Sequence, residues 1–87
     1  MTLSNYLGKL FVEMARMIQR GKEFIRINTQ KNIIECSKDG GLSWHIRFSS
    51  DSKGSFRDLF ENGPEILACT SKGNYYSKDE GHSWHRR

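Results

Sequence analysis

The first part of the chain carries apolar residues at a helical spacing. They recur three and four residues apart at Leu3, Tyr6, Leu7, Leu10, Phe11, Met14, Met17 and Ile18. This pattern is typical of one face of an α-helix. Ser4 suits the N-cap position and Gly21 suits the C-terminal stop. The pattern therefore predicts an amphipathic helix over residues 4–20, packed as a lid on a sheet.

After Gly21 the pattern changes to short, mostly apolar runs that are separated by turn residues. Such runs indicate strands partly covered on both faces. The expected strands lie near residues 23–28, 32–37, 42–48, 65–70, 74–78 and 83–86. Residues 49–55 have the composition of a loop. Residues 56–61 fit either one helical turn or a strand, and the pattern leaves both open.

The strand-forming region consists of two copies of one sequence. Residues 37–45 and 77–85 are identical at seven of nine positions, at an offset of 40, and residues 21–25 parallel residues 63–67 at an offset of 42. The first copy is therefore two residues longer, which we assign to the turn around residues 29–32. We expect a single α+β domain over 1–87, made of helix 4–20, repeat unit 21–48, linker 49–55 and repeat unit 56–87.

Each copy contains the pattern Ser-x-Asp-x-Gly-x-Ser-Trp, at Ser37, Asp39, Gly41, Ser43 and Trp44 and at Ser77, Asp79, Gly81, Ser83 and Trp84. This pattern resembles the Asp-box, the hairpin motif of sialidases and other β-propellers (bacterial neuraminidase repeats). The resemblance covers residues 21–48 and 56–87, and it implies antiparallel, blade-like hairpins with the boxes at the periphery, away from any active site. A turn carboxylate can accept backbone N–H bonds, glycine allows positive φ, and tryptophan can cover the turn. The predicted role of the motif is therefore structural.

The resemblance is incomplete in two respects. Propellers typically have four or more blades, and this chain holds two units. The arginine cluster and tyrosine nucleophile of a sialidase cannot be assigned to residues of this chain. Two architectures stay open: a small sheet with a helical lid, which the helix pattern favours, and a two-blade protomer whose copies close a ring, for example as a trimer.

Composition adds limits on size, charge and location. The chain has 87 residues and a net charge of +4, with its basic residues dispersed. So short a chain has a thin core, which makes self-association attractive. The sequence shows neither a membrane-spanning apolar run nor a secretory leader, so we expect a cytoplasmic protein with no membrane partner. Cys36 and Cys69 lie in strand-like runs, where buried free thiols are favoured over a disulfide.

The sequence assigns no catalytic residue, cofactor or metal site. The three histidines match no zinc spacing. Acid–base sets such as Glu35, His45 and Arg47, or Glu65, His85 and Arg87, can be drawn, but the sequence does not fix their geometry. The candidate binding surface comprises Tyr75, Tyr76, His45, His85, Arg86 and Arg87.

These observations favour a small, non-catalytic interaction module that binds a protein partner or a second copy of itself. One alternative is a nucleic-acid-binding protein that uses the mildly basic surface. Another is a ribonuclease-like or glycan-processing enzyme, because Asp-box hairpins also occur in small microbial ribonucleases.

Overall fold

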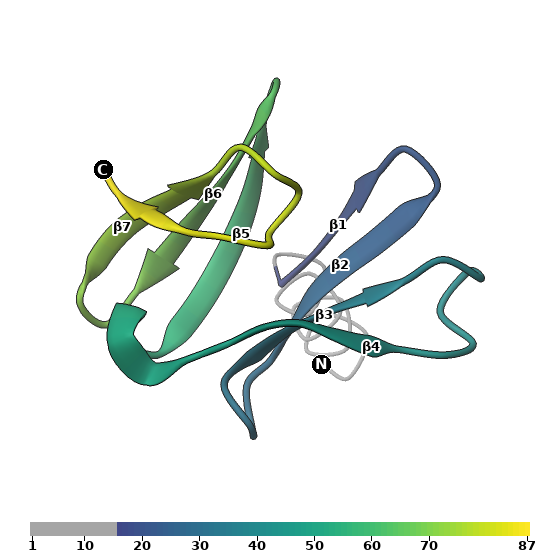
Figure 1. The fold of residues 1–87 in the computed structure, drawn as a ribbon, viewed down its shortest axis with the longest axis horizontal. Helices are drawn as coiled ribbons and strands as arrows, with labels where there is room; N and C mark the ends of the chain where they lie inside the picture. The colour runs from purple at the N-terminus through teal and green to yellow at the C-terminus, as the bar shows by residue number, and fades with distance from the viewer. Residues whose placement is uncertain (1–15) are drawn as a thin grey trace, which may run out of the picture.

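The computed structural model describes residues 16–87, which form two four-stranded antiparallel β-sheets (Figure 1). Within each sheet the strands follow one another in chain order, as in a meander. Sheet 1 contains β1 (Met17–Arg20), β2 (Glu23–Asn28), β3 (Ile33–Ser37) and β4 (His45–Ser49). A short 3-10 helix, η1 (Asp51–Lys53), leads to sheet 2, which contains β5 (Phe56–Asn62), β6 (Glu65–Thr70), β7 (Gly73–Ser77) and β8 (His85–Arg86).

The predicted α+β class is wrong, because residues 16–87 are almost entirely β. Met17–Arg20, the end of the predicted helix 4–20, is strand β1, and η1 is the one helical segment among the described residues. Residues 4–15 of that helix prediction lie outside the described residues. The apolar pair Met17 and Ile18 extended the helical spacing, but pairing with β2 along all four residues decides the local conformation. The ambiguous segment 56–61 is likewise a strand, β5.

The strands of the two sheets pair in the same register. Ile25 is opposite Cys36 in sheet 1, and the equivalent Leu67 is opposite Tyr76 in sheet 2. Strands β2, β3, β6 and β7 lie within one residue of their predicted positions. The loop between β2 and β3 has four residues and the loop between β6 and β7 has two, so the predicted difference in turn length is confirmed.

The hydrophobic core lies between the two sheets. Sheet 1 contributes Ile25, Ile27, Ile34 and Cys36, and sheet 2 contributes Phe56, Leu59, Ile66, Ala68, Tyr75 and Trp84. The Phe56 ring packs between Phe48, with ring centroids 6.0 Å apart, and Trp84, with centroids 5.5 Å apart. Because side chains alternate along a strand, each sheet has an inner face in this core and an outer face that points away from the other sheet.

The linker is held at a position that only glycine fits. Gly54 has φ +86°, and a Cβ atom there would lie 2.6 Å from Ser71 Oγ and 2.9 Å from the Lys72 nitrogen. Asn32 ties the linker to sheet 1: its Nδ2 donates to the Gly54 carbonyl at 3.0 Å, and its Oδ1 accepts from the Phe56 nitrogen at 2.8 Å. These bonds fix where sheet 2 begins relative to sheet 1.

Candidate functional site

The two copies of the Ser-x-Asp pattern fold into the same turn, between the third and fourth strands of each sheet. In the first Ser-x-Asp turn (residues 37–44), Asp39 Oδ1 accepts from Ser37 Oγ at 2.7 Å and from the Ser43 nitrogen at 2.9 Å, and Asp39 Oδ2 accepts from Ser43 Oγ at 2.5 Å. Gly41 donates its N–H to Ser37 Oγ, and Trp44 Nε1 donates to the Gly41 carbonyl. In this turn the polar groups of the motif bind one another.

The second Ser-x-Asp turn (residues 77–84) repeats these bonds. Ser77 Oγ donates to Asp79 Oδ1 at 2.7 Å, the Ser83 nitrogen donates to the same atom at 2.9 Å, and Ser83 Oγ donates to Asp79 Oδ2 at 2.6 Å. Each of these distances lies within 0.1 Å of its counterpart in the first turn. The bonding pattern is therefore set by the local sequence and not by the surroundings.

The surroundings of the two turns differ sharply. The second turn points toward sheet 1, whereas the first, between β3 and β4, points away from sheet 2 (Figure 1). Trp84 is 2% exposed in the core, and a Cβ at Gly81 would touch Arg47 and Ile34 of sheet 1. Trp44 is half-buried, with the Arg26 guanidinium 3.7 Å above its ring. One turn is docked on a neighbouring sheet, and its copy has no docked sheet among the described residues.

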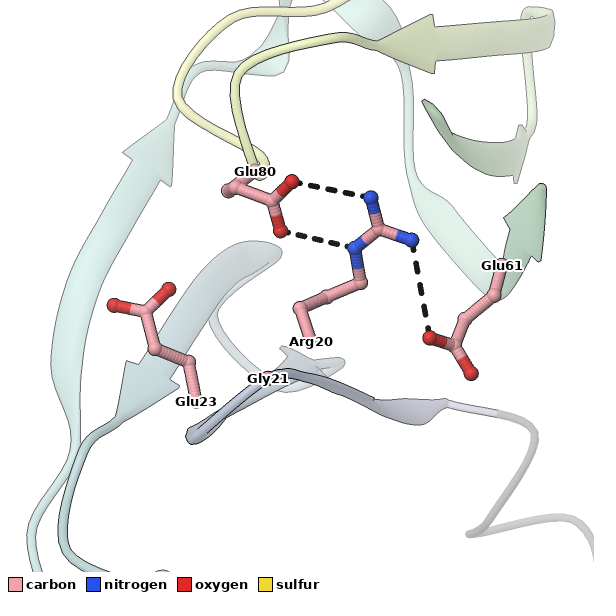
Figure 2. Close-up of a pocket in the computed structure, with 5 residues that line it drawn as sticks. All are labelled: Arg20, Gly21, Glu23, Glu61 and Glu80. Atoms are coloured by element: carbon pink, nitrogen blue, oxygen red, sulfur yellow. Dashed lines mark hydrogen bonds and ion pairs between the residues drawn. The ribbon is translucent and has the colours of Figure 1, made fainter. Parts of the chain in front are cut away.

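Arg20 joins the two sheets in an open cleft of about 440 Å³ that is lined by Arg20, Gly21, Glu23, Glu61 and Glu80 (Figure 2). It donates to both carboxylate oxygens of Glu80, at 2.9 and 3.1 Å, and to the Gly63 carbonyl at 2.9 Å. Glu61 lies 3.8 Å from the same guanidinium. Glu23 points away from Arg20 and pairs with Arg47. The cleft is therefore an ion-paired joint between the sheets.

Two carboxylates of the joint, Glu23 and Glu80, and the two turn aspartates have a lowered pKa. The hydrogen bond from Arg20 lowers the pKa of Glu80, and the bond from Arg47 lowers that of Glu23. Burial raises the pKa of Asp79, but the bonds from Ser83 and Ser77 together outweigh it and hold that pKa at about 2. Bonds from the hydroxyl and backbone of Ser43 lower the pKa of Asp39.

These pKa directions predict acid sensitivity. A carboxylate whose pKa is lower in the folded state stabilises the fold above its unfolded pKa, and this contribution is lost as the pH falls through the folded pKa. We therefore expect the midpoint of thermal unfolding, followed by circular dichroism, to fall between about pH 5 and pH 2. Asp79→Asn should reduce the slope by removing one titrating group. A midpoint that stays constant over this range would contradict the prediction.

The structure divides the predicted binding surface between different faces. Tyr75 is buried in the core, and Arg86 lies opposite it on the neighbouring strand. Tyr76, His85 and Arg87 gather on the outer face of sheet 2: the Arg87 guanidinium lies 4.7 Å from the Tyr76 ring centroid, and the His85 ring lies 5.6 Å from it. His45 is exposed on sheet 1, opposite Cys36.

The two acid–base sets considered from the sequence behave differently. Glu35 bonds Arg26, whereas Arg47 bonds Cys36, the next residue on β3, whose side chain points to the opposite face. The first set therefore does not converge. In the second set, Arg87 donates directly to Glu65, so these two charges neutralise each other.

Residues 16–87 contain no group of three His, Cys, Asp or Glu side chains that could hold a metal ion. Cys36 and Cys69 are free, the first buried and the second half-buried. In the same part of the chain, no helix has both the length and the apolar character that crossing a membrane requires.

Sequence reasoning missed the apolar part of the outer face of sheet 2. A hollow of about 220 Å³ lies there, lined by Phe60, Leu67, Ala68, Cys69, Asn74, Tyr75 and Arg87. Phe60 is 50% exposed, whereas the preceding Leu59 is 2% exposed in the core. The alternation of strand residues could have revealed Phe60 once residues 56–61 were assigned to a strand.

Comparison with models of protein families, with curated proteins and with solved structures found no match to this chain.

Proposed function

We propose that this chain is a small, non-catalytic protein-interaction module, built from two Asp-box-type repeats, whose contact surfaces are the outer faces of its two sheets. The proposal rests on one observation: large apolar side chains are exposed on the outer faces of the sheets and on the first Ser-x-Asp turn. Leu42 is 89% exposed, Ile46 is 65% exposed and Phe60 is 50% exposed. An exposed apolar side chain beside an apolar hollow, as at Phe60, marks a contact surface.

The polar groups support a structural role over a catalytic one. The aspartates and serines of both Ser-x-Asp turns are bonded within their own turns. The joint residues Arg20, Glu80 and Glu23 are paired across the sheets or with Arg47. These groups are already satisfied, so they are not available to bind and activate a substrate.

Charge pairing occupies four of the arginines that the nucleic-acid alternative could use. Arg20, Arg26, Arg47 and Arg87 each lie within hydrogen-bond distance of a glutamate. A phosphate backbone is bound by basic side chains whose charge is available to it. These four arginines are therefore not free to bind a phosphate backbone, which leaves the other basic side chains to the nucleic-acid alternative.

Photo-crosslinking tests the proposal. A benzophenone amino acid replaces Phe60 on the outer face of sheet 2 or Leu42 on the first Ser-x-Asp turn, and the full chain is irradiated in cells of its source organism. Because these positions lie in the proposed contact surfaces, we expect discrete polypeptide adducts. The same amino acid at Thr29, an exposed loop position, is the control and should give none.

Two outcomes would contradict the proposal. One is the absence of any adduct from positions 60 and 42. The other is an adduct that nuclease treatment removes, which would favour the nucleic-acid alternative. A polypeptide adduct of any mass supports an interaction module, and its mass identifies the partner class.

A further inference from the structure

We infer that the partner of the outer face of sheet 2 is sheet 1 of a second copy of this chain. In this contact, the first Ser-x-Asp turn of the second copy would dock on sheet 2. It would do so in the way that the second Ser-x-Asp turn docks on sheet 1 within one chain. This inference rests on the proposed function and names the partner of the same surfaces. Its basis is the internal repeat, which makes the contact between the sheets of one chain a template for a contact between chains.

The template can be transferred residue by residue because both sheets pair in the same register. Strands β1 and β2 correspond to β5 and β6 at an offset of 42 residues. Strands β3 and β4, with the first Ser-x-Asp turn between them, correspond to β7 and β8, with the second turn between them, at an offset of 40. The inner face of sheet 1 therefore corresponds to the outer face of sheet 2. The inner face of sheet 2 corresponds to the outer face of sheet 1.

The outer face of sheet 2 is apolar at most positions where the inner face of sheet 1 is apolar; the exception is Asn74, which takes the place of Ile34. The inner face of sheet 1 buries Ile18, Ile25, Ile27 and Cys36, fully or in part, against sheet 2. Their equivalents on sheet 2 are Phe60, Leu67, Cys69 and Tyr76. Three of these equivalents are half-buried and Phe60 is exposed. This surface has the composition of a core-forming face but lacks a sheet packed on it among residues 16–87.

The outer face of sheet 1 supplies the complementary surface. Leu59, Ile66 and Trp84 form the centre of the inner face of sheet 2, and their equivalents on sheet 1 are Met17, Phe24 and Trp44. One difference is polar: Arg26 and Glu35 occupy the places of Ala68 and Tyr75. These two residues form an ion pair at 2.9 Å and the Arg26 guanidinium lies over the Trp44 ring, so they bring no unpaired charge to the contact.

The arginine that receives the docked turn is repeated as well. Arg47 pairs with Glu23 at 3.0 Å and also donates at 2.9 Å to the carbonyl of Glu80, in the second turn. Arg87 is its equivalent, and it pairs with Glu65, the equivalent of Glu23. By the same geometry, Arg87 would donate to the carbonyl of Gly40 in the second copy.

The ion pair between Arg20 and Glu80 has no counterpart at the proposed contact, because both of its residues are replaced there. Within the chain, Arg20 pairs with Glu80. The equivalent positions at the proposed contact are Asn62 and Gly40, so both charges are missing together. A contact that lost only one of them would leave a desolvated charge. Because both charges are absent, the second copy can dock on this face without burying an unpaired charge.

A contact of this kind joins two different faces and is therefore heterologous. Heterologous contacts close into rings when the rotation allows and otherwise form filaments. Rings of blade-like sheets typically hold about four to eight sheets. With two sheets in each chain, we infer a closed ring of about two to four copies.

The test uses the full chain and two face variants, with mass measured by light scattering and native mass spectrometry. The wild-type chain should give one mass of about two to four copies. Phe60→Glu disables the outer face of sheet 2, and Met17→Glu, at the equivalent of the core residue Leu59, disables that of sheet 1. Because both side chains are exposed, the variants should keep the wild-type circular dichroism spectrum. Each variant alone should be monomeric.

Mixing the two variants is decisive. Each keeps the face that the other has lost, so an equimolar mixture should form a heterodimer with one intact contact. Thr29→Glu, which adds the same charge at an exposed loop position, should assemble like wild type. A wild-type monomer at 100 µM, or a face variant that dimerises with itself, would overturn the inference. In either case crosslinks from positions 60 and 42 to a different polypeptide would leave the proposed function standing.

Discussion

Trp84→Ala is expected to lower the free energy of unfolding by about 3–5 kcal/mol, whereas Trp44→Ala is expected to lower it by about 1–2 kcal/mol. The two tryptophans occupy the same position of the same turn, and both donate Nε1–H to the glycine carbonyl of that turn. Any difference between the variants therefore reports the surroundings and not the motif.

The physical reason for the difference is packing. Trp84 is 2% exposed and packs on Phe56 in the core between the sheets. Truncating it removes buried apolar surface and leaves a cavity that the strands cannot fill. Trp44 is half-buried under Arg26, so its truncation removes less buried surface and leaves a site open to water.

Urea unfolding, followed by circular dichroism at low protein concentration, measures both variants. Low concentration matters because copies in contact would also bury Trp44, and the cost of Trp44→Ala would then rise with protein concentration. Trp44→Phe and Trp84→Phe are the matched controls, since each keeps an aromatic ring. Equal losses for the two alanine variants in the monomer would contradict the burial difference.

The contrast between the two tryptophans also marks what the sequence could predict. The turns were predictable because their bonds are local: Ser37, Asp39 and Ser43 lie within seven residues and bond only one another and the turn backbone. The strand positions were predictable because both copies carry the same alternation of apolar runs and turns. Which tryptophan is buried depends on how one sheet packs on the other, and this is not encoded in either copy alone.

The errors have a related cause. The helix prediction failed at Met17–Arg20 because these four residues continue the apolar spacing before them, whereas their conformation is set by hairpin pairing with β2. The candidate surface is divided between faces because Tyr75 and Tyr76 point to opposite faces, and the sequence does not say which face forms the core. Phe60 went unnoticed because its segment had no assigned conformation.

Arg47→Ala is expected to lower the free energy of unfolding by about 3 kcal/mol. The Arg47 side chain is 6% exposed, and its guanidinium bonds both oxygens of Glu23, the Glu80 carbonyl and Cys36 Sγ. Removing it leaves Glu23 without its main partner in a mostly buried position. The loss should lie at the lower end of the range for broken buried pairs, because Lys38 remains 3.8 Å from Glu23.

The equivalent change Arg87→Ala should behave differently. The Arg87 side chain is 47% exposed, and exposed ion pairs contribute about 1 kcal/mol or less. We therefore expect little loss of stability in the dilute monomer. Assembly should weaken instead, because Arg87 is the residue that would receive the Gly40 carbonyl of a second copy.

A double-mutant cycle in urea separates pairing from packing at the joint. Glu23→Gln combined with Arg47→Met removes both charges but keeps the side-chain volume, so the double variant should recover part of the loss caused by Arg47→Met alone. No recovery would mean that the bonds to the Glu80 carbonyl and Cys36, and not the charge pair, carry the effect. A loss of stability from Arg87→Ala as large as that from Arg47→Ala would contradict the view that identical arginines differ here only in whether a second sheet covers them.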